Sequence, residues 1–352
     1  MSNEFEQLPG AVGSPPQHYG NPLAEQKALA AGSAVVDLSN RSILTITGPD
    51  RLTWLDSLTS QSIAGLKPGE SSETLQLDPN GHLEYAIRLV DDGETAWLLV
   101  DEGEGEPLLA WLGRMRFMLR VELADVSDRY ATIGTLGTPP IAAVVTWVDP
   151  WRSVVSGGHQ YALTADHPGA AFSYSELVIE RSSLVDAAAL PAAGTLALEA
   201  LRVAAWRPRF ATEVDEKSIP HELDWLRSAV HLTKGCYRGQ ETVAKVHNLG
   251  HPPRRLVMLH LDGSEGVLPA PGSSIELGDK TVGQITSSAL HYELGPVALA
   301  VIKRSVDPAA SLTVVSDELR IAAAQELIVP TDAGAVADVP RLPRLGAVAR
   351  SY

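Results

Sequence analysis

The chain has 352 residues, and 28 Lys and Arg stand against 43 Asp and Glu, which gives a net charge of −15 with neutral histidines. An apolar share of 45% with this acid excess is typical of a globular protein, and it argues against a wholly disordered chain and against broad nucleic-acid binding. No run approaches the ~18 apolar residues of a membrane span, and the first ten residues, MSNEFEQLPG, lack the basic and apolar regions of a signal peptide. We therefore expect a cytoplasmic protein without a membrane partner.

The N-terminal half predicts alternating helices and short strands. Residues 1–20 are rich in proline and glycine and are expected to form a mobile arm. Pro22 begins a predicted helix that ends at Gly32. The alternating, β-branched residues 34–48 predict two strands with a turn at Ser39-Asn40, and Asp50 is in place to cap a helix over residues 51–63.

Strand-like segments then follow in antiparallel order. Residues 74–78 and 82–90 flank a Pro-Asn-Gly turn and predict a hairpin, and residues 95–100 predict the next strand. A helix is predicted over residues 107–119. Further strands are predicted over residues 121–128, 130–137 and 143–165. Because no parallel strand–helix–strand rhythm is present, the pattern favours an α+β fold.

The pattern of predicted elements changes after a mixed, polar stretch at residues 207–234. From Arg254 onward, short strands recur with turns every ~8–12 residues, which predicts a small β-barrel. The expected domains are therefore an arm over residues 1–20, an α+β core over 21–250, a barrel over 251–330 and a flexible tail over 331–352.

The densest group of chemically capable residues surrounds the single cysteine, Cys236. One cysteine excludes an intramolecular disulfide and a zinc or cluster site built only from this chain's cysteines. Two glycines flank it and allow a sharp, exposed turn. Lys234 and Arg238 place positive charge nearby, which favours the reactive thiolate.

A helix predicted from Gln240 onward would direct its positive N-terminus toward this turn, and Glu241 and Lys245 form a supportive pair one helical turn apart. An inert cysteine in a structural turn is the alternative. Three histidines bracket the loop without the spacing of a helical metal site, so we expect no metal there; they are His231, His247 and His251.

The string Lys-Gly-Cys-Tyr-x-Gly-Gln-Glu at residues 234–241, followed by Lys245, resembles the signature of the YgfZ family. These are folate-binding proteins related to the T-protein, the aminomethyltransferase of the glycine cleavage system. Segments 36–71, 77–90, 197–222 and 281–304 also resemble the T-protein superfamily, so the resemblance covers roughly residues 21–325.

The resemblance implies a fold of intertwined α+β subdomains with a C-terminal β-barrel, and a bound tetrahydrofolate or derivative between them. It also implies support of iron–sulfur cluster assembly or repair, with iron–sulfur proteins as partners and tRNA-modifying radical enzymes among them. On this reading Cys236 and Lys234 carry the chemistry. The residues that would contact folate are Glu84, Arg202, Tyr237, Arg238, Gln240, Glu241 and Lys245.

Two segments depart from the transferase pattern. The helix that carries Arg-Leu-Glu-Ala-Gly in aminomethyltransferases has Ala204 in place of the pterin-reading glutamate and Trp206 in place of the glycine. The paired aspartates of the transferase hairpin are replaced by Glu84 and Tyr85. These changes favour a folate-binding protein that acts through Cys236, and a folate-dependent aminomethyltransferase or demethylase is the alternative.

Overall fold

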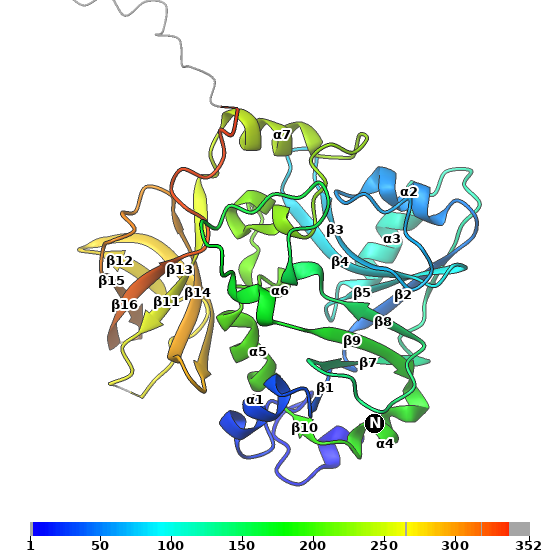
Figure 1. Ribbon diagram of the computed structural model, residues 1–352, viewed down its shortest axis with the longest axis horizontal. Coiled ribbons are helices and arrows are strands. Elements are labelled where there is room, and N and C mark those ends of the chain that lie inside the picture. Colours follow the sequence, from blue (N-terminus) through cyan, green and yellow to red (C-terminus); the bar gives the residue numbers. More distant parts are fainter. Residues whose placement is uncertain (1–2, 265, 318, 338–352) are drawn as a thin grey trace, which may run out of the picture.

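The computed structural model describes residues 3–264, 266–317 and 319–337, and it arranges them as two five-stranded sheets and a closed six-stranded barrel (Figure 1). The first sheet has the order β10-β1-β7-β9-β8 and the second the order β3-β4-β5-β2-β6. All pairings in these sheets are antiparallel except β1 with β10. The strands are β1 (Val35–Asp37), β2 (Ser42–Thr47), β3 (Ser71–Leu77), β4 (Leu83–Asp91), β5 (Thr95–Val100), β6 (Glu122–Asp125), β7 (Tyr130–Thr135), β8 (Val145–Val148), β9 (Ser175–Glu180) and β10 (Ala192–Ala193).

The two sheets are intertwined, because the chain crosses from one to the other after β1 and again after β6. This confirms the predicted α+β class. Helices α2 (Arg51–Leu58) and α3 (Gly105–Met115) cover the outer face of the second sheet. Their apolar side chains pack on it in one cluster that includes Trp54, Leu108 and Leu112.

The barrel confirms the predicted C-terminal architecture. Its strands are β11 (Arg254–Leu261), β12 (Ser274–Leu277), β13 (Lys280–His291), β14 (Gly295–Lys303), β15 (Leu312–Ser316) and β16 (Leu319–Leu327). Alternate side chains of β11 divide between two cores, since Val257 and Leu259 fill the barrel while Leu256 and Met258 join the core beside it. Helix α5 (Thr195–Ala204) lies between the barrel and the first sheet (Figure 1).

The N-terminal segment packs on the first sheet, in contrast to the mobile arm that its composition predicts. Phe5 is fully buried among Val35, Ile133 and Leu184. The Asn3 side chain donates to Asp37 at 2.6 Å. The proline- and glycine-rich segment is therefore ordered rather than unstructured, because one of its aromatic side chains is buried in the core.

The expected tail is described only to residue 337, and residues 338–352 lie outside the described part of the chain. Before that point the segment is packed: Ala333 is buried and the Val336 N–H donates to the His247 carbonyl at 3.0 Å. His247 belongs to α7 (Gln240–Leu249), so the chain beyond the barrel returns to cover this helix.

Several local predictions differ from the structure, and the helix predicted over residues 107–119 is α3, Gly105–Met115. Helix α2 ends at Leu58 rather than near residue 63, because Thr59 is extended and the Ser60 N–H pairs with the Leu75 carbonyl. Asp50 does not cap the helix with its side chain and instead binds Arg120 at 2.6 Å. Residues 149–165 form the 3-10 helix η2 (Pro150–Arg152) and turns after the short β8, since Pro150 lacks an amide hydrogen and two glycines interrupt the segment.

Among the described residues, no helix combines the length and the apolar composition that crossing a membrane requires.

Candidate functional site

Cys236 lies on an exposed loop that leads directly into α7, and its thiol is free. Tyr237 anchors the loop in the central core, where its ring is only 7% exposed. Gly239 has φ +83°, and a Cβ at this residue would lie 2.7 Å from the Asp78 carbonyl oxygen. The loop conformation therefore depends on one buried ring and on the close approach of the β3–β4 turn.

Lys234 holds the loop to the body of the protein. Its ammonium group donates to the backbone carbonyls of Asp56, Thr59 and Gln61 at 2.6–2.9 Å, and it lies 3.3 Å from the Asp56 carboxylate. Burial lowers the pKa of Lys234, although Asp56 opposes this effect. With three carbonyls and a carboxylate around it, this cation has a structural role that the motif alone did not indicate.

Among the other motif residues, some form hydrogen bonds or ion pairs within the protein and some are exposed to solvent. The Arg238 guanidinium binds the Glu84 carboxylate at 3.1 Å, and Gln76 donates to the same oxygen at 2.6 Å. The Gln240 amide donates to the Lys234 carbonyl at 3.3 Å. Glu241 and Lys245 are exposed on the confirmed helix, and in the described part of the chain no ion pair joins them.

Gly239→Ala is expected to lower the free energy of unfolding by about 2 kcal/mol, because it combines left-handed strain with a clash against the Asp78 carbonyl. Gly235→Ala is the matched control, since a Cβ there meets only open space and φ is not positive. We expect its effect to stay within about 0.5 kcal/mol. Urea denaturation checks both variants, and equal destabilisation would contradict the prediction.

Arg202 belongs to a different region from the cysteine loop. Its guanidinium binds Glu199 at 2.8 Å and Glu213 at 2.9 Å, and it donates to the Ser287 hydroxyl on β13. This group ties α5 to the barrel and to α6 (Phe210–Glu213). None of the hydrogen-bond partners that the described residues give Arg202 belongs to the cysteine loop.

Arg202 lines a small cavity between the two sheets and α5, which we call the arginine chamber. The chamber has a volume of about 40 Å³. Five arginines reach it from β4, α5 and the loops beside β2 and α6, and aromatic and acidic side chains complete the wall. The lining residues are Arg41, Arg88, Arg202, Arg207, Arg209, Trp147, Phe172, Tyr174, Leu198, Pro208, Asp149 and Glu199.

Buried ion pairs fix most of this wall. Arg88 binds Asp101 at 2.9 Å and Glu176 at 3.2 Å, and Arg41 also contacts Glu176. Although burial opposes ionisation, the charges of Arg88 and Arg41 hold the pKa of Asp101 well below its ordinary value. The chamber is therefore a preorganised set of charges in a water-poor environment, where electrostatic interactions are strong.

Several polar atoms around the chamber are buried without a hydrogen-bond partner among the described residues. They include donors and acceptors: Arg88 Nη1, Arg209 Nε, Asp101 Oδ2, Glu104 Oε2 and Glu176 Oε2. Buried polar atoms are nearly always paired in native proteins, because each unpaired one costs about 1–3 kcal/mol. This concentration indicates a place where a polar ligand or ordered water completes the network.

A larger cavity lies where α6 meets the barrel, and we call it the junction cavity. Its volume is about 440 Å³, and its walls carry Thr212, Asp215, Arg254, Gln284 and Lys303. Glu213 also lines it and binds Arg202 of the chamber at 2.9 Å. One ion pair therefore lies between the two spaces.

The residues that depart from the transferase pattern are not part of the chamber lining. Tyr85 is stacked with Phe210, with ring centroids 6.4 Å apart. Ala204 lines a shallow cavity beside His291 and Tyr292. Trp206 has φ +58°, the left-handed conformation that suits the glycine of the family pattern.

The bracketing histidines are separated in the structure. His247 is buried against Tyr161, His231 packs on Gly157, and His251 contacts the Ala333 carbonyl. Within residues 3–264, 266–317 and 319–337, no group of three or more His, Cys, Asp or Glu side chains is arranged to hold a metal ion.

Apart from Arg202, the residues that line the chamber are not predicted by the sequence pattern. A usable signal was present for Arg88, which interrupts the apolar strand 82–90 and therefore had to be buried beside a counter-charge. Arg41, Arg207 and Glu104 gave no such signal, because they lie in polar turns and loops and are brought together only by tertiary packing.

Comparison with known proteins agrees with this architecture. Residues 7–148 match the family described as the GCVT N-terminal domain. The chain is 26% identical over 312 residues to an aminomethyltransferase of Nostoc sp., covering 82% of this chain and 81% of that protein. It is 26% identical over 321 residues to an aminomethyltransferase of Streptomyces coelicolor, with 84% and 83% covered.

Among solved structures, the glycine cleavage system aminomethyltransferase T from Bartonella henselae superposes with a TM-score of 0.70 at 15% identity, over 94% of this chain and 97% of that chain. This likeness shows that the fold is that of the T-protein. The matches together support a place for the chain in the T-protein superfamily, and the narrower YgfZ assignment stays a prediction.

Proposed function

We propose that this chain binds a reduced folate at the arginine chamber and the junction cavity, and that it acts in folate-dependent one-carbon transfer of the aminomethyltransferase class. The observation that carries the proposal is the set of unpartnered donors and acceptors around the chamber, at the meeting point of both sheets and α5. The aminomethyltransferase relatives and the T-protein fold support the same class.

The residues present fit the polar chemistry of a folate. The edge of a pterin ring alternates hydrogen-bond donors and acceptors. The chamber lining offers donors on Arg88 and Arg209, and the acceptors of Asp101 and Glu176 lie next to it as the ion-pair partners of Arg88. Small-molecule pockets have volumes of about 300–1,000 Å³. The junction cavity of about 440 Å³ lies in this range, so the body of the ligand belongs there.

Full entry of the ring system requires the chamber of about 40 Å³ to widen. The Arg202–Glu213 pair between the two spaces is the element that has to move. A bound reduced folate would supply ring nitrogens that carry a one-carbon unit. The contribution of this chain is to bind and orient that group and to keep water away from it.

Arg209→Gln is expected to weaken binding of 5-formyltetrahydrofolate about tenfold, because it removes a charged contact from the chamber lining at a side chain that is 29% exposed. Isothermal calorimetry measures the change, and the melting temperature should shift little. Arg320→Gln on the outside of the barrel is the control, since its ion pair with Glu276 is far more exposed. A wild-type protein that binds no reduced folate at millimolar concentration would overturn the proposal.

A second candidate function is support of iron–sulfur proteins through Cys236, with tetrahydrofolate as the ligand and the iron–sulfur proteins as partners. The exposed thiol on a loop fixed by Tyr237 and Gly239 favours it. A single thiolate does not hold a cluster by itself, so a partner chain or an external thiol would have to supply the other ligands.

Cys236→Ser is expected to leave the melting temperature nearly unchanged, because the side chain is exposed. If the second candidate is correct, the serine variant will not restore the activity of iron–sulfur enzymes in cells that lack this protein, whereas the wild type will. Full restoration by the serine variant would return Cys236 to the class of structural turn residues.

A further inference from the structure

Helix α3 has one side packed on the second sheet and one side open to solvent. Leu108 and Leu112 are fully buried among the apolar residues of that sheet. Glu106, Ala110 and Arg114 recur every four residues along the opposite side of the helix, and all three are exposed. We call this exposed stripe, together with the turns at both ends of the helix, the α3 face.

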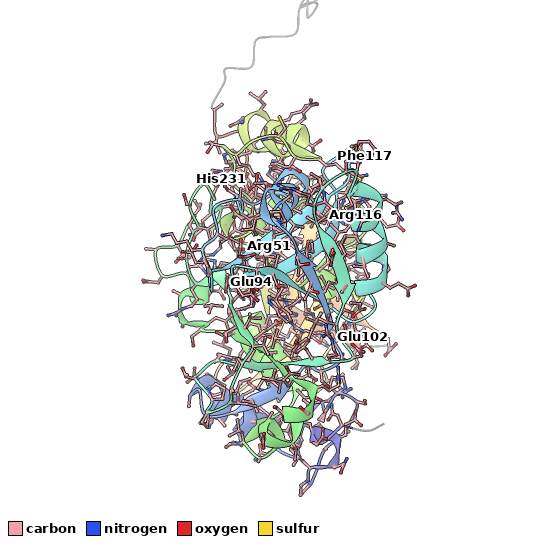
Figure 2. The ribbon with its side chains drawn as sticks, turned by 90° about the vertical axis from the view of Figure 1, so that its right-hand side faces the viewer. Arg51, Glu94, Glu102, Arg116, Phe117 and His231 are labelled. Atoms are coloured by element: carbon pink, nitrogen blue, oxygen red, sulfur yellow. The ribbon has the colours of Figure 1, made fainter. Side chains whose placement is uncertain are left out.

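The two ends of the α3 face carry opposite charge. Glu102 and Glu106 lie at the N-terminal end, and Arg114 and Arg116 lie at the C-terminal end. Figure 2 shows Glu102 and Arg116 at opposite ends of α3, which lies at the margin of the molecule. Within the described part of the chain none of these four side chains forms an ion pair, and Glu102 contacts only the Asn40 amide at 3.0 Å.

The basic end of the α3 face also exposes large apolar side chains. Phe117 is 83% exposed and Met118 is 90% exposed, and Met115 beside them is also exposed. The Trp54 indole donates to the Met115 carbonyl at 3.2 Å and so fixes the end of the helix. Phenylalanine, methionine and arginine are the residue types that are enriched where proteins contact one another. The charges alone would suit the helix dipole, whereas this apolar turn indicates a partner.

The charges of the α3 face are arranged symmetrically about Ala110. Glu106 precedes Ala110 by four residues and Arg114 follows it by four, so each lies about 6 Å from Ala110 along the helix axis. A second α3 laid antiparallel across Ala110 therefore places each arginine opposite a glutamate. The alanine methyl group allows the two helix axes to approach to about 8 Å. The α3 face is thus complementary in charge and in shape to a second copy of itself.

We infer that two copies of this chain associate through the α3 face, in antiparallel orientation about a two-fold axis beside Ala110. In this contact Arg114 binds Glu106 of the partner subunit, and Arg116 reaches Glu102 of the partner subunit. Each copy gives and receives the same interactions, so the contact closes as a dimer and does not extend into a fibre.

The exposed apolar turn finds its place in the same arrangement. Phe117 follows Ala110 by seven residues and Gly103 precedes it by seven, so the two-fold axis brings the turn of one copy over Gly103 of the partner subunit. A Cβ at Gly103 would meet open space, so no side chain obstructs the ring. Removal of this apolar surface from water is the main driving force for association, and the ion pairs set the orientation.

The contact is small and leaves the proposed ligand site open. One helix side and one turn from each copy give less than the roughly 800 Å² per partner of a stable interface, so the dimer is reversible. In Figure 1 the barrel lies on the left of the molecule and α3 on the right. The junction cavity beside the barrel therefore stays accessible, and dimerisation and folate binding can be tested separately.

Exchange of the charges tests the orientation. Sedimentation velocity should show the wild type shifting from monomer to dimer as its concentration rises through the micromolar range. The double variants Arg114→Glu/Arg116→Glu and Glu102→Lys/Glu106→Lys should each stay monomeric, because like charges then meet. An equimolar mixture of the two should form dimers again, because an acidic face meets a basic one. Restored association also shows that both variants are folded.

A cross-link tests the position of the axis, because Ala110 lies opposite itself in this dimer. In a Cys236→Ser background, Ala110→Cys should form a disulfide-linked dimer under mild oxidation. Arg320→Cys, on a 58% exposed side chain outside the barrel, is the matched control and should stay monomeric. A wild type that remains monomeric, a dimer that survives either charge reversal, or an Ala110→Cys variant that cross-links no better than the control would overturn the inference.

Discussion

Arg207→Met is expected to lower the free energy of unfolding by about 3–5 kcal/mol. The Arg207 guanidinium is buried and binds Glu73 at 2.7 Å and Asp149 at 2.9 Å. It also lies 5.2 Å from the centre of the Trp151 ring. Methionine fills much of the volume but leaves two carboxylates buried without a cation, and that unpaired charge is the main cost.

Arg120→Met is the control for this prediction, because Arg120 is 73% exposed and its ion pair with Asp50 lies at the surface. We expect its effect to stay below about 1 kcal/mol. Urea denaturation followed by tryptophan fluorescence measures both variants. An Arg207→Met protein as stable as the control would show that Glu73 and Asp149 find other partners or become protonated at little cost.

His221 is expected to make the fold sensitive to acid. It is fully buried beneath α7, where one ring nitrogen contacts the Val243 carbonyl at 3.0 Å and Tyr161 lies beside the ring. Burial lowers the pKa of His221 to about 3. Since the unfolded chain protonates this histidine near pH 6.5, stability is fully present above that pH and is lost as the pH falls toward 3.

His221→Gln isolates this contribution from other titrating groups. Relative to the glutamine variant, the wild type should lose about 1.4 kcal/mol of unfolding free energy per pH unit below about pH 6.5. His260→Gln, on the 41% exposed side chain of a barrel strand, provides the baseline for loss of an imidazole. Parallel stability curves for the wild type and His221→Gln between pH 4 and 7 would contradict the prediction.

The element pattern of this protein follows from local sequence. In strands β4 and β5, apolar residues either alternate with polar ones or form a continuous run, and turn residues separate the two strands. The barrel strands recur with short turns between them. The existence and order of these strands were therefore predictable. The exposed loop at Cys236 and the helix after it also followed from two glycines and the Gln240 start. Local propensity and hydrophobic periodicity depend on only a few neighbouring residues. Secondary structure can therefore be predicted from a single sequence.

Tertiary packing decided the features that no short segment contains. Phe5 turns a proline- and glycine-rich arm into part of the core, because a buried aromatic ring outweighs local flexibility. Lys234 has the motif's charge, yet three distant carbonyls determine where its ammonium group lies.

The arginine chamber is the clearest such case. Arg41, Arg88 and Arg207 come from separate segments. The hydrogen-bonded counter-charges of Arg41 and Arg207 lie 58 to 135 positions away, and Arg88 pairs with Asp101, 13 positions away, and with Glu176 on the other sheet. A buried charge is stable only where the fold supplies its partner, and that partner is chosen by sheet topology rather than by sequence neighbours. The sequence by itself therefore determined the elements and the cysteine loop, whereas the charged chamber arose only when the two sheets and α5 came together.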